Sequence, residues 1–111
     1  MALDGQVPQE IKLTIVDYLD KIKRQIPVSK AILFGSFAKG DFNSESDVDI
    51  AIFSNHFESM SRVEGITYLL RYAMEYPVDL EPLAFTNKEL EERLGIVDEI
   101  LRTGIEIHDL M

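Results

Sequence analysis

A short stretch from Gly35 to Asp49 holds the residues of this sequence whose types and spacing could do chemistry. Asp47 and Asp49 are separated by one residue and open an apolar run that ends at Phe53. On an extended strand, residues two apart point to the same face at a spacing of about 7 Å, so both carboxylates would face one spot. The two charges repel each other there unless a cation lies between them. Oxygen ligands of this kind favour Mg²⁺ or Mn²⁺, which shares its coordination with substrate phosphates.

Gly35 and Ser36 form a turn on the N-terminal side of the aspartate pair. They follow the apolar run Ala-Ile-Leu-Phe and precede small residues that end at Gly40. A residue without a Cβ lets the backbone turn sharply and approach a ligand closely. Ser36 adds a hydroxyl and a backbone N–H at the expected start of a short helix, which is a natural anion site. The turn and the aspartate pair together therefore favour a binding site over an ordinary turn.

Three other interpretations compete for this stretch. A phosphate-binding P-loop requires Lys and then Ser or Thr directly after its second glycine, whereas Asp41 and Phe42 follow Gly40. An EF-hand requires Gly at loop position six and Glu at position twelve, where Ser46 and Ile52 stand. A solvated acidic hairpin turn stays open as the third interpretation. It is disfavoured because the aspartate pair begins an apolar strand.

These motifs resemble the signature of the DNA-polymerase-β-type nucleotidyltransferase superfamily, and in particular its small, free-standing minimal nucleotidyltransferases. The matching residues are Gly35-Ser36-x-Ala38-x-Gly40 followed by Asp47-x-Asp49. The likeness in order and length covers nearly the whole chain, although the family usually has arginine where Lys39 stands. The resemblance implies that the two aspartates hold Mg²⁺ together with a third carboxylate from a later strand. The implied nucleotide-binding residues are Gly35, Ser36, Lys39 and Gly40.

Two residues compete for the position of the third carboxylate. Asp79 and Glu81 alternate with apolar residues, so both would lie on one face of a strand over residues 77–85. The family places its ligand directly after an apolar residue of such a strand, which favours Asp79. Pro82 favours the same choice, because a residue without an N–H predicts that the strand is already leaving the sheet beside Glu81. Asp79 is therefore the expected third catalytic and metal-binding residue, with Glu81 as the alternative.

Length and composition fit one globular domain over residues 1–111. A chain of this length buries roughly two thirds of its unfolded surface. The absence of cysteine excludes disulfides and thiolate sites, and no apolar run approaches the roughly 20 residues of a membrane span. Without a signal-peptide pattern at the N-terminus, these features predict a cytoplasmic protein with no membrane partner.

The net charge of −9 restricts the class of partner. A protein that grips a long nucleic acid by its phosphates needs a basic groove, so no long nucleic acid is expected. A single nucleotide that is neutralised by its own Mg²⁺ fits an acidic chain better.

Apolar periodicity places the motifs on alternating helices and strands. Helices are predicted over residues 8–25, 60–75 and about 87–103, and strands over 29–34, 47–53, 77–85 and 105–108. The predicted class is therefore α/β (α+β), with a small mixed sheet of about four strands packed against helices. The resemblance makes this a nucleotidyltransferase fold.

These helices carry more detailed predictions. The helix over 8–25 is expected to bury one apolar stripe, and the other two are expected to begin with capping boxes. The stripe is Ile11, Ile15, Leu19, Ile22 and Ile26, and the capping boxes are Ser61 with Glu64 and Thr86 with Glu89. The helix over 60–75 is expected to bury the face that contains Val63, Ile66, Thr67, Leu70, Ala73 and Met74, and Tyr68, Tyr72 and Tyr76 are expected to serve packing rather than base stacking. The last helix is expected to run without a break through Leu94 to Gly104, a position that tolerates left-handed geometry.

The resemblance also implies a reaction and partners. An acceptor hydroxyl attacks the α-phosphate of a nucleoside triphosphate, most readily ATP, and pyrophosphate leaves. Minimal nucleotidyltransferases are often encoded with a small helical HEPN-type protein as a toxin–antitoxin pair. The alternative to an enzyme is therefore an antitoxin subunit that acts mainly through complex formation, and a homo-oligomer is also compatible with the sequence. A plain structural domain would leave the clustered carboxylates unexplained.

Overall fold

The structure is a computed structural model that describes residues 7–110. The described chain contains the helices α1 (Gln9–Lys23), α2 (Ser36–Lys39), α3 (Arg62–Ala73), α4 (Asn87–Glu92) and α5 (Ile96–Thr103), and the strands β1 (Lys30–Phe34), β2 (Val48–Phe53), β3 (Leu80–Phe85) and β4 (Ile105–Glu106). Two short 3₁₀ helices follow β2 and β4, at Asn55–Ser59 and Ile107–Leu110. The predicted mixture of helices and strands is confirmed.

The four strands form one mixed sheet in the order β3-β2-β1-β4. β1 is antiparallel to β2 and β4, whereas β2 and β3 are parallel. Pro82 therefore lies on an edge strand, as its missing N–H predicted. The pairing of β3 with β2 nevertheless continues to Phe85 opposite Phe53. The expectation that the chain leaves the sheet at Pro82 is wrong.

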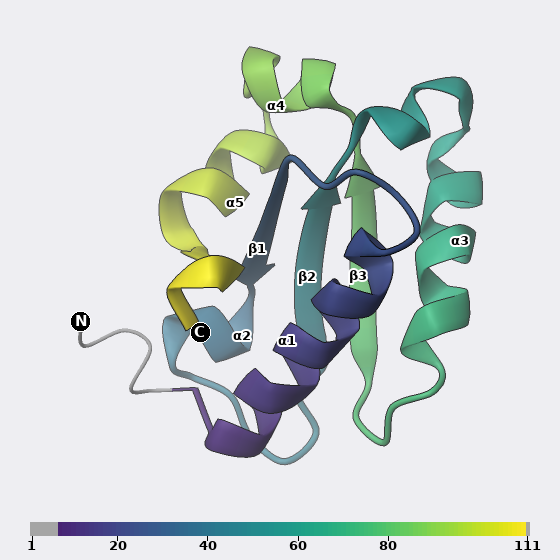
Figure 1. The fold of residues 1–111 in the computed structure, drawn as a ribbon. Coiled ribbons are helices and arrows are strands. Elements are labelled where there is room, and N and C mark those ends of the chain that lie inside the picture. Colours follow the sequence, from purple (N-terminus) through teal and green to yellow (C-terminus); the bar gives the residue numbers. More distant parts are fainter. Residues whose placement is uncertain (1–6, 111) are drawn as a thin grey trace.

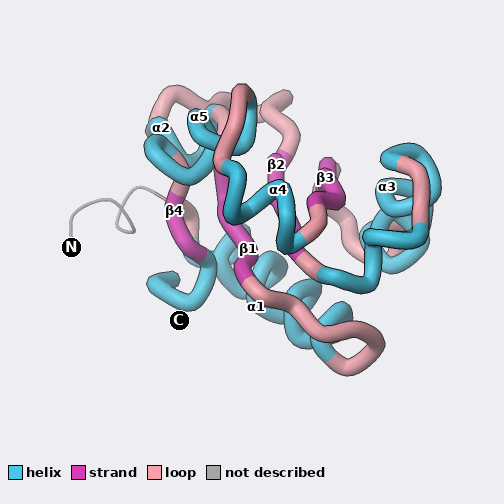
Figure 2. The backbone as a smooth tube through the Cα atoms, turned by 90° about the horizontal axis from the view of Figure 1, so that it is seen from above, coloured by secondary structure: helices cyan, strands magenta, loops and turns pink. Residues whose placement is uncertain are grey.

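Helices cover both faces of the sheet. α1 lies against one face and α5 against the other (Figures 1 and 2). The predicted apolar stripe of α1 is buried in the larger core, together with Ile50 and Ile52 of β2. Val97 and Ile100 of α5 pack with Phe53 and Phe85 in a smaller core on the opposite face. Because successive residues of β2 alternate between these two cores, the strand reads as a continuous apolar run.

Helix α3 buries a face that shares only Ala73 with the predicted one. Its buried residues are Gly65, Leu69 and Ala73, whereas Val63 is 72% exposed and Met74 is 81% exposed. A Cβ at Gly65 would lie 2.8 Å from the Ala84 Cβ, so the small residue lets the helix approach β3 closely. The buried face is therefore the one that permits the closer backbone contact, and not the one with the larger hydrophobic residues.

The tyrosines of this segment pack against the main core, as predicted. Tyr68, Tyr72 and Tyr76 are partly buried, and the rings of Tyr68 and Tyr72 contact each other at a centroid distance of 5.5 Å. The N-terminus of α3 is held by the predicted capping box, in which Ser61 and Glu64 bond each other's backbone N–H. The Arg62 guanidinium donates to the Ala84 carbonyl at 2.5 Å. That bond satisfies one acceptor on the free edge of β3.

The last predicted helix is two helices. α4 ends at Arg93, which adopts a left-handed conformation, and Gly95 also has a positive φ, of 56°. Leu94 continued the apolar spacing but is 70% exposed. Arg93 Nε donates to Asp98 Oδ1 at 2.8 Å, and this bond links the residue after α4 to α5. The break turns α5 onto the second face of the sheet, which periodicity alone did not indicate.

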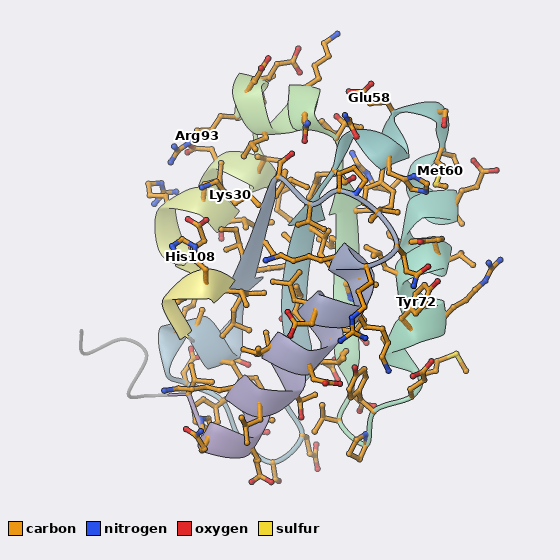
Figure 3. All side chains as sticks on the ribbon, viewed as in Figure 1. Lys30, Glu58, Met60, Tyr72, Arg93 and His108 are labelled. Atoms are coloured by element: carbon orange, nitrogen blue, oxygen red, sulfur yellow. The ribbon has the colours of Figure 1, made fainter. Side chains whose placement is uncertain are left out.

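The end of the chain also departs from the predictions. Gly104 is extended, with φ −85° and ψ 176°, so the expected left-handed geometry is wrong. Glycine is needed there for space, because a Cβ would lie 2.3 Å from Ile32 Cγ2. β4 has only two residues, and Glu106 holds it to β1 through Lys30 Nζ at 3.1 Å. His108 Nδ1 contacts the same carboxylate at 3.1 Å. Lys30 and His108 are labelled in Figure 3.

No helix within residues 7–110 has the length and apolar character needed to cross a membrane.

Tyr18 gives a test of the main core. Its hydroxyl is buried and donates to the Leu69 carbonyl at 2.9 Å, which links α1 to α3. Burial, and to a smaller extent Tyr76, raise the pKa of Tyr18 above its usual value. We expect Tyr18→Phe to lower the free energy of unfolding by about 1 kcal/mol at pH 7.

The difference between wild type and Tyr18→Phe should depend on pH. Because folding raises the pKa of Tyr18, its neutral hydroxyl contributes fully below the unfolded-state pKa of about 10 and less as pH rises further. Urea unfolding of both proteins from pH 7 to 11.5 should show the gap narrowing above about pH 10. A gap that stays constant would contradict the buried, neutral state of this hydroxyl.

Candidate active site

Gly35 and Asp49 are in direct contact at the junction of β1 and β2. The strand register places Phe34, the last residue of β1, opposite Asp49. Gly35 follows with φ 76° and ψ −153°, a conformation that side chains rarely adopt. A Cβ at Gly35 would lie only 2.2 Å from Asp49 Oδ2. The glycine is therefore required both for the turn and for the space that the carboxylate occupies.

The segment after Gly35 forms the predicted short helix, α2. The Gly35 carbonyl accepts the N–H groups of Ala38 and Lys39, both at 3.1 Å. Gly40 closes the helix in a left-handed conformation, with φ 85°. Phe37 and Ala38 are buried and anchor α2 to the core, whereas the Lys39 side chain is exposed and Ser36 is half-buried. The structure thus holds Ser36 next to the Gly35–Asp49 contact and directs Lys39 to solvent.

A loop that is closed by hydrogen bonds within itself leads from α2 to the aspartates. The Asn43 side chain accepts the Glu45 N–H at 2.8 Å, and the Ser46 hydroxyl accepts the Asn43 N–H at 2.9 Å. The Ser46 N–H in turn donates to the Asn43 carbonyl at 3.1 Å. Polar side chains that close on their own backbone in this way define a turn. The turn places Asp47 at the start of β2.

Asp49 lies in a negatively charged environment. The parallel pairing of β2 and β3 places Glu81 directly opposite Asp49. Burial raises the pKa of the Asp49 carboxyl, and the charges of Glu81 and then Asp47 raise it further. We call Asp47, Asp49 and Glu81 the carboxylate cluster. The ionised cluster is destabilised by its own repulsion, which a bound cation would relieve.

Asp79 lies one residue before β3. Its carbonyl accepts the Val48 N–H at 2.8 Å, so its backbone stands beside the start of β2, where Asp47 is located. The Asp79 side chain is exposed. The structure therefore brings Glu81, the alternative in the sequence analysis, opposite Asp49, and leaves Asp79 at the end of the sheet. One reason for preferring Asp79, an early departure of β3, is lost, and the identity of the third ligand stays a prediction.

A cleft of about 530 Å³ opens at the end of the sheet where Asp79 lies. Its walls come from the N-terminus of α1, from α2, from the loop after α2 and from the chain before β3. The residues that line it are Pro8, Glu10, Ile11, Phe37, Phe42, Asn43, Ser44, Glu45, Ser46, Val48, Pro77, Val78 and Asp79. This volume is in the range of small-molecule sites. No local pattern predicted the cleft, because its residues come from separate segments without a motif.

The donor set of this region suits a hard cation that is shared with a substrate. Within the part of the chain that the structure describes, no group of three carboxylate or imidazole side chains is arranged to hold a metal ion by itself. Mg²⁺ usually takes one or two protein carboxylates and completes its coordination with water and substrate phosphates. The oxygen-only cluster and the raised pKa of Asp49 fit that mode of binding.

Comparisons with known proteins identify relatives of this chain. Residues 15–107 match the family model described as a nucleotidyltransferase domain. A candidate protein adenylyltransferase from Methanocaldococcus jannaschii is 26% identical over 102 residues, which is 86% of this chain and 100% of that protein. The crystal structure of a candidate nucleotidyltransferase from Sulfolobus solfataricus superposes with a TM-score of 0.66 at 15% identity, covering 87% of this chain and 78% of that one. The last comparison supports the fold.

Gly35→Ala tests the contact on which the site depends. The added methyl group would meet both an unfavourable backbone conformation and Asp49 Oδ2. Positive-φ strain costs about 1–3 kcal/mol, and we expect the clash to add to it. Gly95→Ala is the matched control, because Gly95 has φ +56° but nothing within 4 Å of an added Cβ. Urea unfolding should show the larger loss of stability for Gly35→Ala.

A double-mutant cycle isolates the contact. In an Asp49→Ala background the carboxylate is gone, so Gly35→Ala should cost less than in the wild type, whereas Gly95→Ala should cost the same in both backgrounds. If Gly35→Ala lowered the free energy of unfolding equally in the two backgrounds, the Asp49 carboxylate would not limit the space for a side chain at position 35.

Proposed function

We propose that this chain, which belongs to the nucleotidyltransferase domain family, transfers AMP from ATP to a hydroxyl group. We propose that this reaction depends on Mg²⁺. The observation that carries the proposal is the contact between the Gly35 turn and Asp49. It unites a turn suited to phosphate with a carboxylate suited to a metal ion. A triphosphate with its cation requires both in one place.

The turn and α2 are proposed to hold the phosphates. Gly35 lets the backbone approach the triphosphate, and the half-buried Ser36 offers its hydroxyl and N–H beside it. Gly40 closes α2 directly after Lys39. The exposed ammonium of Lys39 is then free to reach a phosphate oxygen as a point charge.

The carboxylates are proposed to hold Mg²⁺, with Mn²⁺ as a substitute. Asp47 and Asp49 are the expected ligands, with Asp79 or Glu81 as the third. When bound, the ion would make the acceptor hydroxyl more acidic and offset the charge of the departing pyrophosphate. The acceptor oxygen forms a bond to the α-phosphorus while the bond from that phosphorus to the bridging oxygen of the β-phosphate breaks. The third carboxylate is proposed to accept the proton of the hydroxyl.

The acceptor is proposed to belong to a protein. This extends to our chain the activity in the name of the relative from M. jannaschii, a protein adenylyltransferase. A HEPN-type helical protein is the proposed partner, which would make this chain the antitoxin of a cytoplasmic toxin–antitoxin pair. The contact of Gly35 with Asp49 supports an enzymatic role over one limited to complex formation, because binding a partner does not require that geometry.

Thermal unfolding with MgATP tests the nucleotide site. We expect MgATP to raise Tm more than Mg²⁺ or ATP alone, because the ion needs both the carboxylates and the phosphates. Ligand at a hundredfold excess over Kd should stabilise the protein by about 2.7 kcal/mol. Asp49→Asn should abolish this shift, whereas Asp20→Asn on the exposed side of α1 should retain it.

Asp49→Asn should also raise Tm in the absence of metal. The folded-state pKa of Asp49 is raised, so ionisation of this group destabilises the fold at pH values above its unfolded pKa, and a neutral amide removes that effect. A wild-type Tm that does not respond to millimolar MgATP would contradict the assigned site.

A comparison of Asp79→Asn with Glu81→Gln tests which residue supplies the third carboxylate. We predict loss of AMP transfer in Asp79→Asn and weaker nucleotide-dependent stabilisation in Glu81→Gln, because Glu81 lies opposite Asp49 and acts on its charge. Transfer is followed with ATP labelled on the α-phosphate at saturating Mg²⁺. Loss of transfer in Glu81→Gln with full activity in Asp79→Asn would reverse the two roles and leave the reaction class standing.

A further inference from the structure

The charged residues that line the cleft at the end of the sheet are all acidic. Glu10, Glu45 and Asp79 line it, and among its described lining residues none is Lys, Arg or His. Glu10 and Glu45 are exposed at its rim. A triphosphate carries several negative charges, so this cleft would repel it. The phosphates have a better place beside the Gly35 turn, where Lys39 supplies a positive charge.

The interior of the cleft is apolar and aromatic. The rings of Phe37 and Phe42 stack at a centroid distance of 4.6 Å and an interplanar angle of 17°. Ile11 and Val78 add aliphatic surface from two other segments. An occupant therefore needs an apolar body that contacts these walls and positive groups that meet the rim.

The cleft meets the candidate active site at Asp79, the predicted third carboxylate. Val48 lines the cleft, so its neighbours Asp47 and Asp49 point to the opposite face of β2. Asp79, whose carbonyl accepts the Val48 N–H, also lines it. A hydroxyl group that is seated in the cleft is thus next to Asp79, the carboxylate proposed to take its proton.

We propose that this cleft binds the acceptor, and that the acceptor is a peptide segment in which a hydroxyl residue is flanked by Lys or Arg. The inference rests on the proposed function. The acceptor oxygen bonds to the α-phosphorus, pyrophosphate leaves with the electrons of the broken P–O bond, and the hydroxyl proton passes to a carboxylate at the cleft. The net charge of −9 attracts a basic segment to the whole protein, and the cleft gives that attraction a specific place.

Three fluorescent peptides test the charge preference. Each contains one serine with two flanking residues on either side, which are lysine in the first peptide, glutamine in the second and glutamate in the third. Fluorescence anisotropy should show the tightest binding for the lysine peptide and the weakest for the glutamate peptide. The preference should shrink at 0.5 M salt, because rim charges are exposed and screened.

Two double variants locate the binding. Glu10→Gln with Glu45→Gln removes the rim charge of the cleft. Glu91→Gln with Glu92→Gln removes the same charge from exposed positions of α4, at the opposite end of the sheet (Figure 1). We expect the first variant to bind the lysine peptide about three- to tenfold more weakly and the glutamine peptide as before. The second variant should match the wild type with both peptides, and both variants should retain the Tm shift with MgATP.

Transfer of label completes the test. With ATP labelled on the α-phosphate, the lysine peptide should acquire label on its serine, and the same peptide with alanine in place of serine should not. If the wild type binds MgATP but does not prefer the lysine peptide, the inference is overturned while the proposed function stands.

Other outcomes overturn the inference for different reasons. Equal weakening in both double variants would mean general attraction to an acidic protein. Weaker MgATP binding in the Glu10, Glu45 variant, with unchanged peptide binding, would assign the cleft to the nucleotide. A wild-type protein that fails to bind MgATP would remove the proposed function and, with it, the acceptor site.

Discussion

The contact between Gly35 and Asp49 is the constraint on which the rest of this structure depends. It exists because β1 and β2 are antiparallel neighbours whose register places Phe34 opposite Asp49. The turn after Phe34 then meets the carboxylate, and only a glycine leaves room for it. The turn would suit phosphate and the carboxylate would suit a cation. Their contact supplies the two halves of a site for a triphosphate with its metal ion.

The packing of the sheet fixes this contact and sets the charge around it. Ile50, Ile52 and Leu33 are fully buried, so neither strand can slip by one residue without exposing its core face. The same pairing rules bring Glu81 opposite Asp49 from β3. The fold thus stabilises a group of like charges through apolar burial elsewhere. Such local repulsion is characteristic of sites that become stable when their ligand binds.

Local sequence signals predicted the elements better than their orientation. The α1 stripe, the capping boxes and the Gly-Ser turn were recognised because each depends on residues within a few positions of one another. The buried face of α3 was predicted wrongly because apolar periodicity does not take account of the close approach to Ala84 that Gly65 permits. The break at Arg93 and the pairing of Glu81 with Asp49 depend on contacts between distant segments. The acidic cleft was missed for the same reason.

The central claim is that a nucleotidyl group, rather than a terminal phosphate, is transferred. The direct measurement is to incubate the protein, Mg²⁺ and cell lysate with ATP labelled on either the α- or the γ-phosphate and to separate the products. Nucleotidyl transfer predicts a labelled acceptor with the α-label only, together with labelled pyrophosphate from the γ-label. A labelled acceptor with the γ-label, or no labelled acceptor with either, would contradict the account.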